Sequence, residues 1–126
     1  MKRAKLGAVC LVLLLGISLG VSICMERIHA PVARDLELAA KTVCEGDFET
    51  ALSLEARADA AWQRWDRFRA CFCDHTPMEE ADALFRKLRV YAALKKEEEF
   101  AAACAELARK VSAVGEAHAL RWWNFV

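Results

Sequence analysis

A run of twenty residues without a charged side chain, residues 6–25, most constrains what this chain can fold into. A helix rises about 1.5 Å per residue, so twenty residues cross the ~30 Å hydrocarbon core of a bilayer. Lipid offers no partners to backbone N–H and C=O groups, and a spanning segment must therefore be helical. Because the run is apolar on every face, a buried helix of a soluble protein is not favoured. The sequence predicts a transmembrane helix over residues 6–25.

The residues before this run predict its orientation. Lys2, Arg3 and Lys5 precede it directly. Basic flanks stay on the cytoplasmic side of a membrane. We therefore expect a cytoplasmic tail over residues 1–5 and an extracytoplasmic domain over residues 26–126, in a single-pass protein of the cell membrane.

Two alternatives to an uncleaved anchor remain open. A cleaved signal peptide also combines a basic start with an apolar stretch, although that stretch usually has about 7–15 residues. Attachment of lipid would use Cys24, but the bulky Ile23 stands directly before it. The length of the run favours the anchor.

Composition narrows the class of the remaining domain. Residues 26–126 carry fifteen basic and eighteen acidic side chains, a net charge of −3, which disfavours nucleic acid or strongly anionic surfaces as partners. The whole chain has 126 residues, too few for a barrel or dinucleotide-binding enzyme fold. Only five Gly and two Pro occur, and no segment alternates with period two, so β-sandwiches are disfavoured. We expect an all-α domain of four helices, arranged as two antiparallel hairpins.

Local signals place the first of these hairpins. Pro31 suits the first turn of a helix, Gly46 suits its end, and Asp47 suits the cap of the next helix. That next helix is expected from Phe48 to about Cys73, with Arg64, Arg67 and Arg69 along its flanks. The expected buried positions of the first helix are Leu36, Ala39, Ala40 and Val43, and those of the second are Phe48, Leu52, Ala58, Trp62, Trp65 and Phe72. Trp62 and Trp65 lie three residues apart, which predicts one shared buried face.

The second hairpin has the clearest start signal. Thr76 offers a capping hydroxyl, Pro77 a first-turn proline and Glu79 a capping-box carboxylate. A polar turn over residues 95–99 then precedes the last helix, which Gly115 is expected to end or loosen. The expected buried positions are Met78, Ala81, Phe85, Leu88 and Ala92 in the third helix, and Phe100, Cys104, Leu107, Val111, Val114 and His118 in the fourth.

Three stretches also carry a resemblance to a known family. These are EGDFETALSLEARADAAWQRW (45–65), DHTPMEEADALFRKLRVYAAL (74–94) and the closing LRWWNFV (120–126). With the basic start and the apolar span, they resemble a family of small bacterial membrane-anchored proteins described only as a domain of unknown function. The resemblance implies a topology and a location, and it implies no activity. The Cys71-Phe72-Cys73 triplet is not part of that family's pattern.

The cysteines and histidines support one alternative function, a secreted or anchored thiol- or metal-binding module. Cys71, Cys73 and His75 offer thiolates and an imidazole, which suit zinc or copper. Zinc sites, however, usually have four ligands and at least two residues between paired cysteines. We therefore interpret this segment as a structural turn and expect no metal or other cofactor.

The remaining cysteines leave their redox state open. Cys44 and Cys104 fall on apolar helical faces, which predicts buried thiols. An even number of cysteines outside the membrane also permits disulfides among Cys44, Cys71, Cys73 and Cys104, in any of three connectivities.

The sequence offers no catalytic constellation. His29, His75 and His118 stand in no recognisable motif, so no enzyme and no small-molecule substrate are expected. Trp122 and Trp123 fit either a membrane interface or packing of the tail onto the hairpins, the latter being preferred. The leading hypothesis is a non-enzymatic interaction or scaffold domain with a protein partner, held by a membrane anchor.

Overall fold

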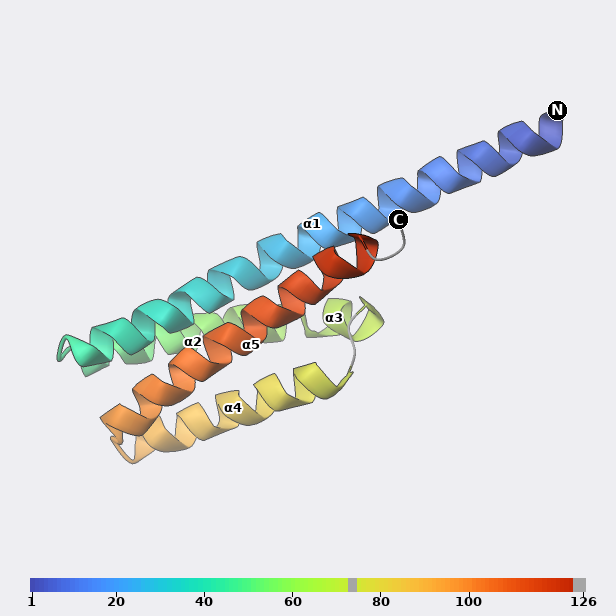
Figure 1. The fold of residues 1–126 in the computed structure, drawn as a ribbon. Coiled ribbons are helices and arrows are strands. Elements are labelled where there is room, and N and C mark those ends of the chain that lie inside the picture. The colour runs from blue at the N-terminus through green and yellow to red at the C-terminus, as the bar shows by residue number, and fades with distance from the viewer. Residues whose placement is uncertain (73–74, 124–126) are drawn as a thin grey trace.

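The computed structural model is all-helical. It describes the backbone of residues 1–72 and 75–123 and the side chains of residues 1–71 and 75–116. The elements are α1 (Lys2–Cys44), α2 (Phe48–Arg64), α3 (Asp66–Phe72), α4 (His75–Ala93) and α5 (Glu97–Trp123) (Figure 1). No strand occurs in these described ranges, so the predicted all-α class is confirmed.

Helix α1 joins the apolar run to the domain without a break. It has 43 residues and contains Pro31 in its interior, so the prediction that Pro31 opens a helix is wrong. A proline inside a helix removes one backbone hydrogen bond. Packing compensates for that loss, because His29 and Val32, on either side of the proline, are both 1% exposed. The contacts of these two side chains with the domain hold the helical path through Pro31.

The turn between α1 and α2 follows its local signals. Gly46 has φ +86°, a conformation that glycine adopts without steric cost. Asp47 caps α2: its Oδ1 accepts a 3.1 Å hydrogen bond from the Thr50 backbone N–H, and its Oδ2 accepts a 2.6 Å bond from the Thr50 hydroxyl. These bonds lower the pKa of Asp47. The predicted helix end and helix cap are both confirmed.

Helix α2 is shorter than predicted. It ends at Arg64, Trp65 stands at its C-terminus with non-helical dihedrals, and the separate helix α3 follows. The expectation of a single helix reaching Cys73 is therefore wrong. The break also separates the two tryptophans, because Trp62 is 1% exposed whereas Trp65 is 41% exposed. A shared face at a spacing of three residues requires one continuous helix, and here the helix stops between them.

Two further helix bounds differ from expectation. Helix α4 begins at His75, so Thr76 lies inside the helix and does not cap it. Helix α5 continues through Gly115 to Trp123. Gly115 is buried against α1, where a Cβ atom would lie 3.5 Å from the Cβ of His29. Gly115 therefore marks a close approach of α1 and α5.

The core lies where α1 packs against α2 and α5, and where α4 packs against α5 (Figure 1). Most predicted core positions are confirmed as buried, namely Leu36, Ala39, Val43, Ala58, Trp62, Met78, Ala81, Phe85, Leu88, Phe100, Cys104, Leu107, Val111 and Val114. The side chains of Phe72 and His118 lie outside those described.

Ion pairs at the surface join neighbouring helices. The guanidinium of Arg57 in α2 lies 2.6 Å from the Asp35 carboxylate in α1. The ammonium of Lys110 in α5 lies 2.9 Å from Glu80 in α4. Such exposed pairs contribute little stability.

Candidate functional site

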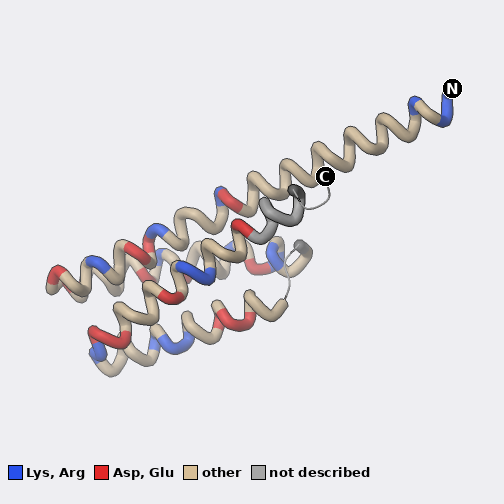
Figure 2. The backbone as a smooth tube through the Cα atoms, viewed as in Figure 1, with Lys and Arg blue, Asp and Glu red and all other residues tan. Residues whose placement is uncertain are grey.

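The first half of α1 is the most unusual surface of the molecule. It projects beyond the other helices (Figure 1), and after its basic start it carries no charge until it reaches the domain (Figure 2). Its large apolar side chains are 44–67% exposed, namely Leu6, Val9, Leu11, Val12, Leu13, Leu14, Leu15, Ile17, Leu19 and Ile23. A soluble monomer rarely exposes so large a contiguous apolar surface. Among the described helices, α1 alone is long and apolar enough to span a membrane.

Burial begins in the last turns of the apolar run, where Val21 and Ser22 are half-buried. Met25 is fully buried, while the charged side chains of Glu26 and Arg27 next to it are exposed. His29 follows one helical turn later, and its Nδ1 lies 2.7 Å from the Met25 carbonyl oxygen. The packed domain thus overlaps the last turns of the uncharged segment, with no intervening linker.

A cavity of about 200 Å³ lies between α1 and α5 at this junction. Its lining consists of Glu26, His29, Ala30, Ser112, Gly115 and Glu116. The absence of a side chain at Gly115 leaves room beside the His29 ring. The cavity is small and open, so we assign it no ligand.

Only two members of the predicted thiol–imidazole set, Cys71 and His75, lie among the residues whose side chains the structure describes. Cys71 in α3 is exposed, His75 is the exposed first residue of α4, and Cys73 lies outside the described residues. Among the described side chains, residues 1–71 and 75–116, no three or more of His, Cys, Asp or Glu form a group that could hold a metal ion.

The other cysteines differ in burial. Cys104 is fully buried, and burial raises its thiol pKa to about 12, with a further contribution from the charge of Glu55. Cys44 is exposed, so the prediction that it is buried is wrong. Cys44 is the last residue of α1, directly after the buried Thr42 and Val43. The five described cysteines, Cys10, Cys24, Cys44, Cys71 and Cys104, are all free thiols.

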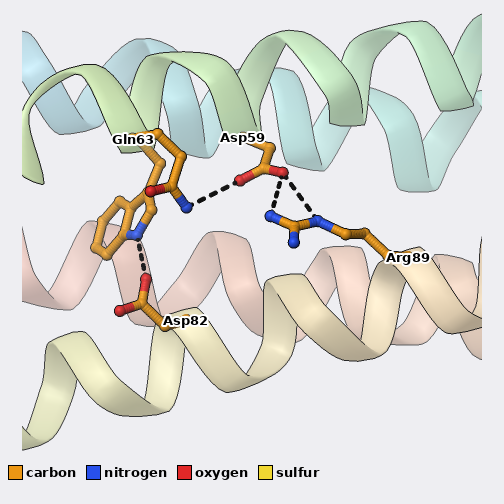
Figure 3. A network of polar contacts seen from close by, with 5 residues as sticks. Asp59, Gln63, Asp82 and Arg89 are labelled. Carbon is orange, nitrogen blue, oxygen red and sulfur yellow. Dashed lines mark hydrogen bonds and ion pairs between the residues drawn. The ribbon is translucent and has the colours of Figure 1, made fainter.

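Trp62 is the centre of a cluster that joins four helices. Its indole Nε1–H donates a 2.7 Å hydrogen bond to Oδ1 of Asp82 in α4 (Figure 3). The ring of His29 in α1 meets it edge-on at 5.8 Å between centroids, and Phe85 in α4 lies at the same distance. Arg69 in α3 places its guanidinium carbon 3.6 Å from the centroid of the Trp62 ring and donates a hydrogen bond to the Trp62 carbonyl.

Arg69 is therefore not on a helix flank, as predicted, but fully buried. The cation–π contact and the carbonyl replace part of the hydration that its guanidinium loses. No spacing rule could have found this contact, because it depends on the helix break at Trp65. The break turns α3 back over the ring of Trp62.

Glu55 is a second buried polar group that sequence reasoning missed. It is 7% exposed, and its Oε1 has no hydrogen-bond partner among the described residues. Its pKa is raised to about 7: burial contributes most, the negative charge of Asp59 also raises it, and the positive charge of Arg89 lowers it. The helical pattern contained a signal, because Glu55 lies four residues after the buried Ala51 and three before the buried Ala58.

Asp59 and Arg89 form the polar edge of this region. Asp59 Oδ2 accepts hydrogen bonds of 3.2 Å from Arg89 Nε and 2.8 Å from Arg89 Nη2, and Gln63 lies 3.4 Å from Oδ1 (Figure 3). The pair of Asp59 and Arg89 thus connects α2 to α4. Glu55 lies one turn before Asp59 and is left without such a partner, so its charged form is poorly stabilised.

No family model, characterised protein or solved structure matches this chain. The resemblance to membrane-anchored proteins of unknown function stays a prediction. The function must therefore be argued from the exposed part of α1 and from the domain that it carries.

Proposed function

We propose that this chain is a single-pass membrane protein in which residues 6–25 anchor an extracytoplasmic, antiparallel four-helix domain. The domain serves as a non-enzymatic interaction or scaffold module. The observation that carries this proposal is the abrupt change along α1 from an exposed apolar surface to a packed one.

Two features support a spanning anchor. The uncharged run of twenty residues is longer than the roughly 7–15 residues usual for a signal peptide. Helix α1 also continues through the end of the run into the domain, so the first helix of the domain is an extension of the anchor. The orientation of the anchor would therefore set the orientation of the first helix of the domain.

The charges support the orientation. Lys2, Arg3 and Lys5 lie at the free end of α1, where basic residues favour the cytoplasmic side. The domain beyond Met25 has a net charge of −3, and short acidic segments do little to oppose translocation. This arrangement places the domain outside.

Apolar side chains on the domain support an interaction role. Leu38 on α1 is 47% exposed, and near the end of α4 Val90 and Leu94 are 53% and 60% exposed. Val90 and Leu94 are four residues apart and so lie next to each other on the helical surface. They offer an apolar contact to a protein partner.

Protease treatment of intact cells tests the proposal. A chain with an N-terminal epitope should lose its domain to external protease while the epitope stays protected and membrane-bound. Protection of the domain until lysis would overturn the orientation. Release of the untreated domain into the medium, without the epitope, would show a cleaved signal peptide.

A further inference from the structure

The end of the domain nearest the apolar half of α1 is formed by α3 and the last turns of α5 (Figure 1). The contact between the rings of Trp62 and His29 sets the end of α2 level with His29 in α1. His29 lies four residues beyond Met25, which corresponds to about 6 Å along the helix. The chain that follows Trp62 therefore begins close to the level at which the uncharged run ends.

An exposed aromatic side chain lies at this end. Trp65 is 41% exposed, and its ring meets that of the half-buried Phe68 edge-on at 6.1 Å between centroids. An exposed tryptophan on a water-facing surface loses the benefit of burying a large apolar ring. The boundary between lipid and water accommodates both the ring and its N–H group, and tryptophan is enriched there.

Two cationic residues lie close to Trp65 in the sequence. Arg64 and Arg67 are exposed, and no ion pair is recorded for either of them among the described side chains. Arg69, by contrast, is buried on the ring of Trp62. With Asp66 the only acidic side chain among them, residues 64–68 carry a local charge of +1 in a domain of net charge −3.

We propose that residues 64–68 lie against the phospholipid headgroup layer of the membrane that α1 enters, with Trp65 in the interface and Arg64 and Arg67 on lipid phosphates. The inference rests on the membrane anchor proposed above. A guanidinium forms paired hydrogen bonds to phosphate, which is the group present at this depth. The local positive charge matches it, although the net charge of the domain does not.

The contact would give the domain a defined tilt. Because α1 passes from the membrane into the domain as one helix, it fixes the distance of the domain from the bilayer but leaves the tilt of the helix against the bilayer free. A second contact through residues 64–68, away from α1, restricts that tilt. The same face of the domain would then always point away from the membrane.

Quenching by brominated lipid tests the position of Trp65. The full chain is reconstituted in phosphatidylcholine vesicles, with and without phosphatidylglycerol, and in the same vesicles made with lipids brominated near the headgroup. The difference in fluorescence between the wild type and Trp65→Phe isolates the emission of Trp65. We expect brominated lipid to quench most of this difference. If the Trp65 emission is equally strong in vesicles with and without brominated lipid, the inference is overturned.

Charge reversal tests the two arginines. Arg64→Glu/Arg67→Glu should remove the quenching of Trp65. The control Lys87→Glu/Lys96→Glu makes the same change of charge on a different part of the domain, in α4 and the turn after it, and should leave the quenching intact. Equal quenching in both double variants would overturn the phosphate contact. If the arginine variant loses quenching only in vesicles that contain phosphatidylglycerol, the contact is with anionic lipid. If it loses quenching in vesicles with and without phosphatidylglycerol, the contact is with the phosphate group that both lipids carry.

Flotation with the vesicles and resistance to alkaline extraction separate this inference from the proposed function. A chain that floats and resists extraction without Trp65 quenching keeps its anchor, and only the contact through residues 64–68 is overturned. A chain that does not float with the vesicles overturns both.

Discussion

The indole of Trp62 and the carboxylate of Asp82 are joined by a 2.7 Å hydrogen bond, although they lie twenty residues apart on α2 and α4. The bond satisfies the one polar group of a side chain that is otherwise enclosed by His29, Phe85 and Arg69. A buried tryptophan usually needs such a partner. This pair therefore specifies how α4 sits against α2.

Trp62→Ala is expected to lower the free energy of unfolding by about 3–5 kcal/mol, the usual cost of removing a buried aromatic side chain. Small domains have about 5–15 kcal/mol in total, so the domain would lose much of its stability. Urea unfolding of the full chain in detergent, followed by circular dichroism, measures the change. The exposed Trp65→Ala is the control and should cost less than about 1 kcal/mol. Equal losses in the two variants would contradict the burial assigned to Trp62.

Glu55→Gln should change how stability depends on pH. The pKa of Glu55 is raised from 4.5 to about 7, so the folded state holds its proton more tightly than the unfolded chain. The stability of the wild type should therefore fall as the pH rises from about 4.5 to 7 and level off above that, by at most ~3 kcal/mol. In Glu55→Gln this fall should be absent.

Unfolding midpoints across this pH range measure the effect. The exposed Glu106→Gln on α5 is the control and should keep the pH dependence of the wild type. Parallel curves for the wild type and Glu55→Gln would show that water or a charged partner stabilises the carboxylate of Glu55.

Gly115→Ala should stabilise the domain by up to ~1 kcal/mol. Alanine has the higher helix propensity, and its Cβ would meet His29 at 3.5 Å, an ordinary contact. Thermal unfolding reports the change. Gly46→Ala is the matched contrast and should destabilise by ~1–2 kcal/mol, because Gly46 has φ +86°. Destabilisation by Gly115→Ala would mean that α1 and α5 tolerate no side chain between them.

Cys71→Ser/Cys73→Ser should leave the metal content and helicity of the purified chain unchanged. Cys71 and His75 are exposed and belong to no described cluster of metal-binding side chains. Elemental analysis and a free-thiol count test this expectation. Stoichiometric zinc or copper that disappears in the double variant would instead support the thiol- or metal-binding alternative.

Leu13→Lys/Leu14→Lys should release the chain from membranes during alkaline extraction. A lysine at the centre of a spanning helix costs roughly 2.5–3.5 kcal/mol for insertion. Val90→Lys/Leu94→Lys makes the same exchange at exposed positions of the domain and should leave membrane retention unchanged. Retention of both variants would show that α1 does not span the bilayer through residues 13 and 14.

The features that sequence reasoning predicted correctly are local or compositional. The uncharged run at residues 6–25 needs only its own length and polarity to predict an apolar helix. Gly46 and Asp47 act through their own backbone conformation and a side chain three residues away. The buried faces of α4 and α5 follow from helical periodicity, which holds wherever a helix is unbroken.

Tertiary contacts decided the rest. Pro31 stays inside α1 because neighbouring side chains pack against the domain on both sides of it. Because α2 ends at Arg64, Trp65 is exposed and Arg69 lies against the ring of Trp62. Helical periodicity does not predict such contacts across a break between two helices. The pKa of Glu55 depends on its burial and on the charge of Arg89 in α4, as well as on Asp59 in its own helix. Burial of a polar side chain is set by what surrounds it in space, and for these residues most of that surrounding comes from other helices.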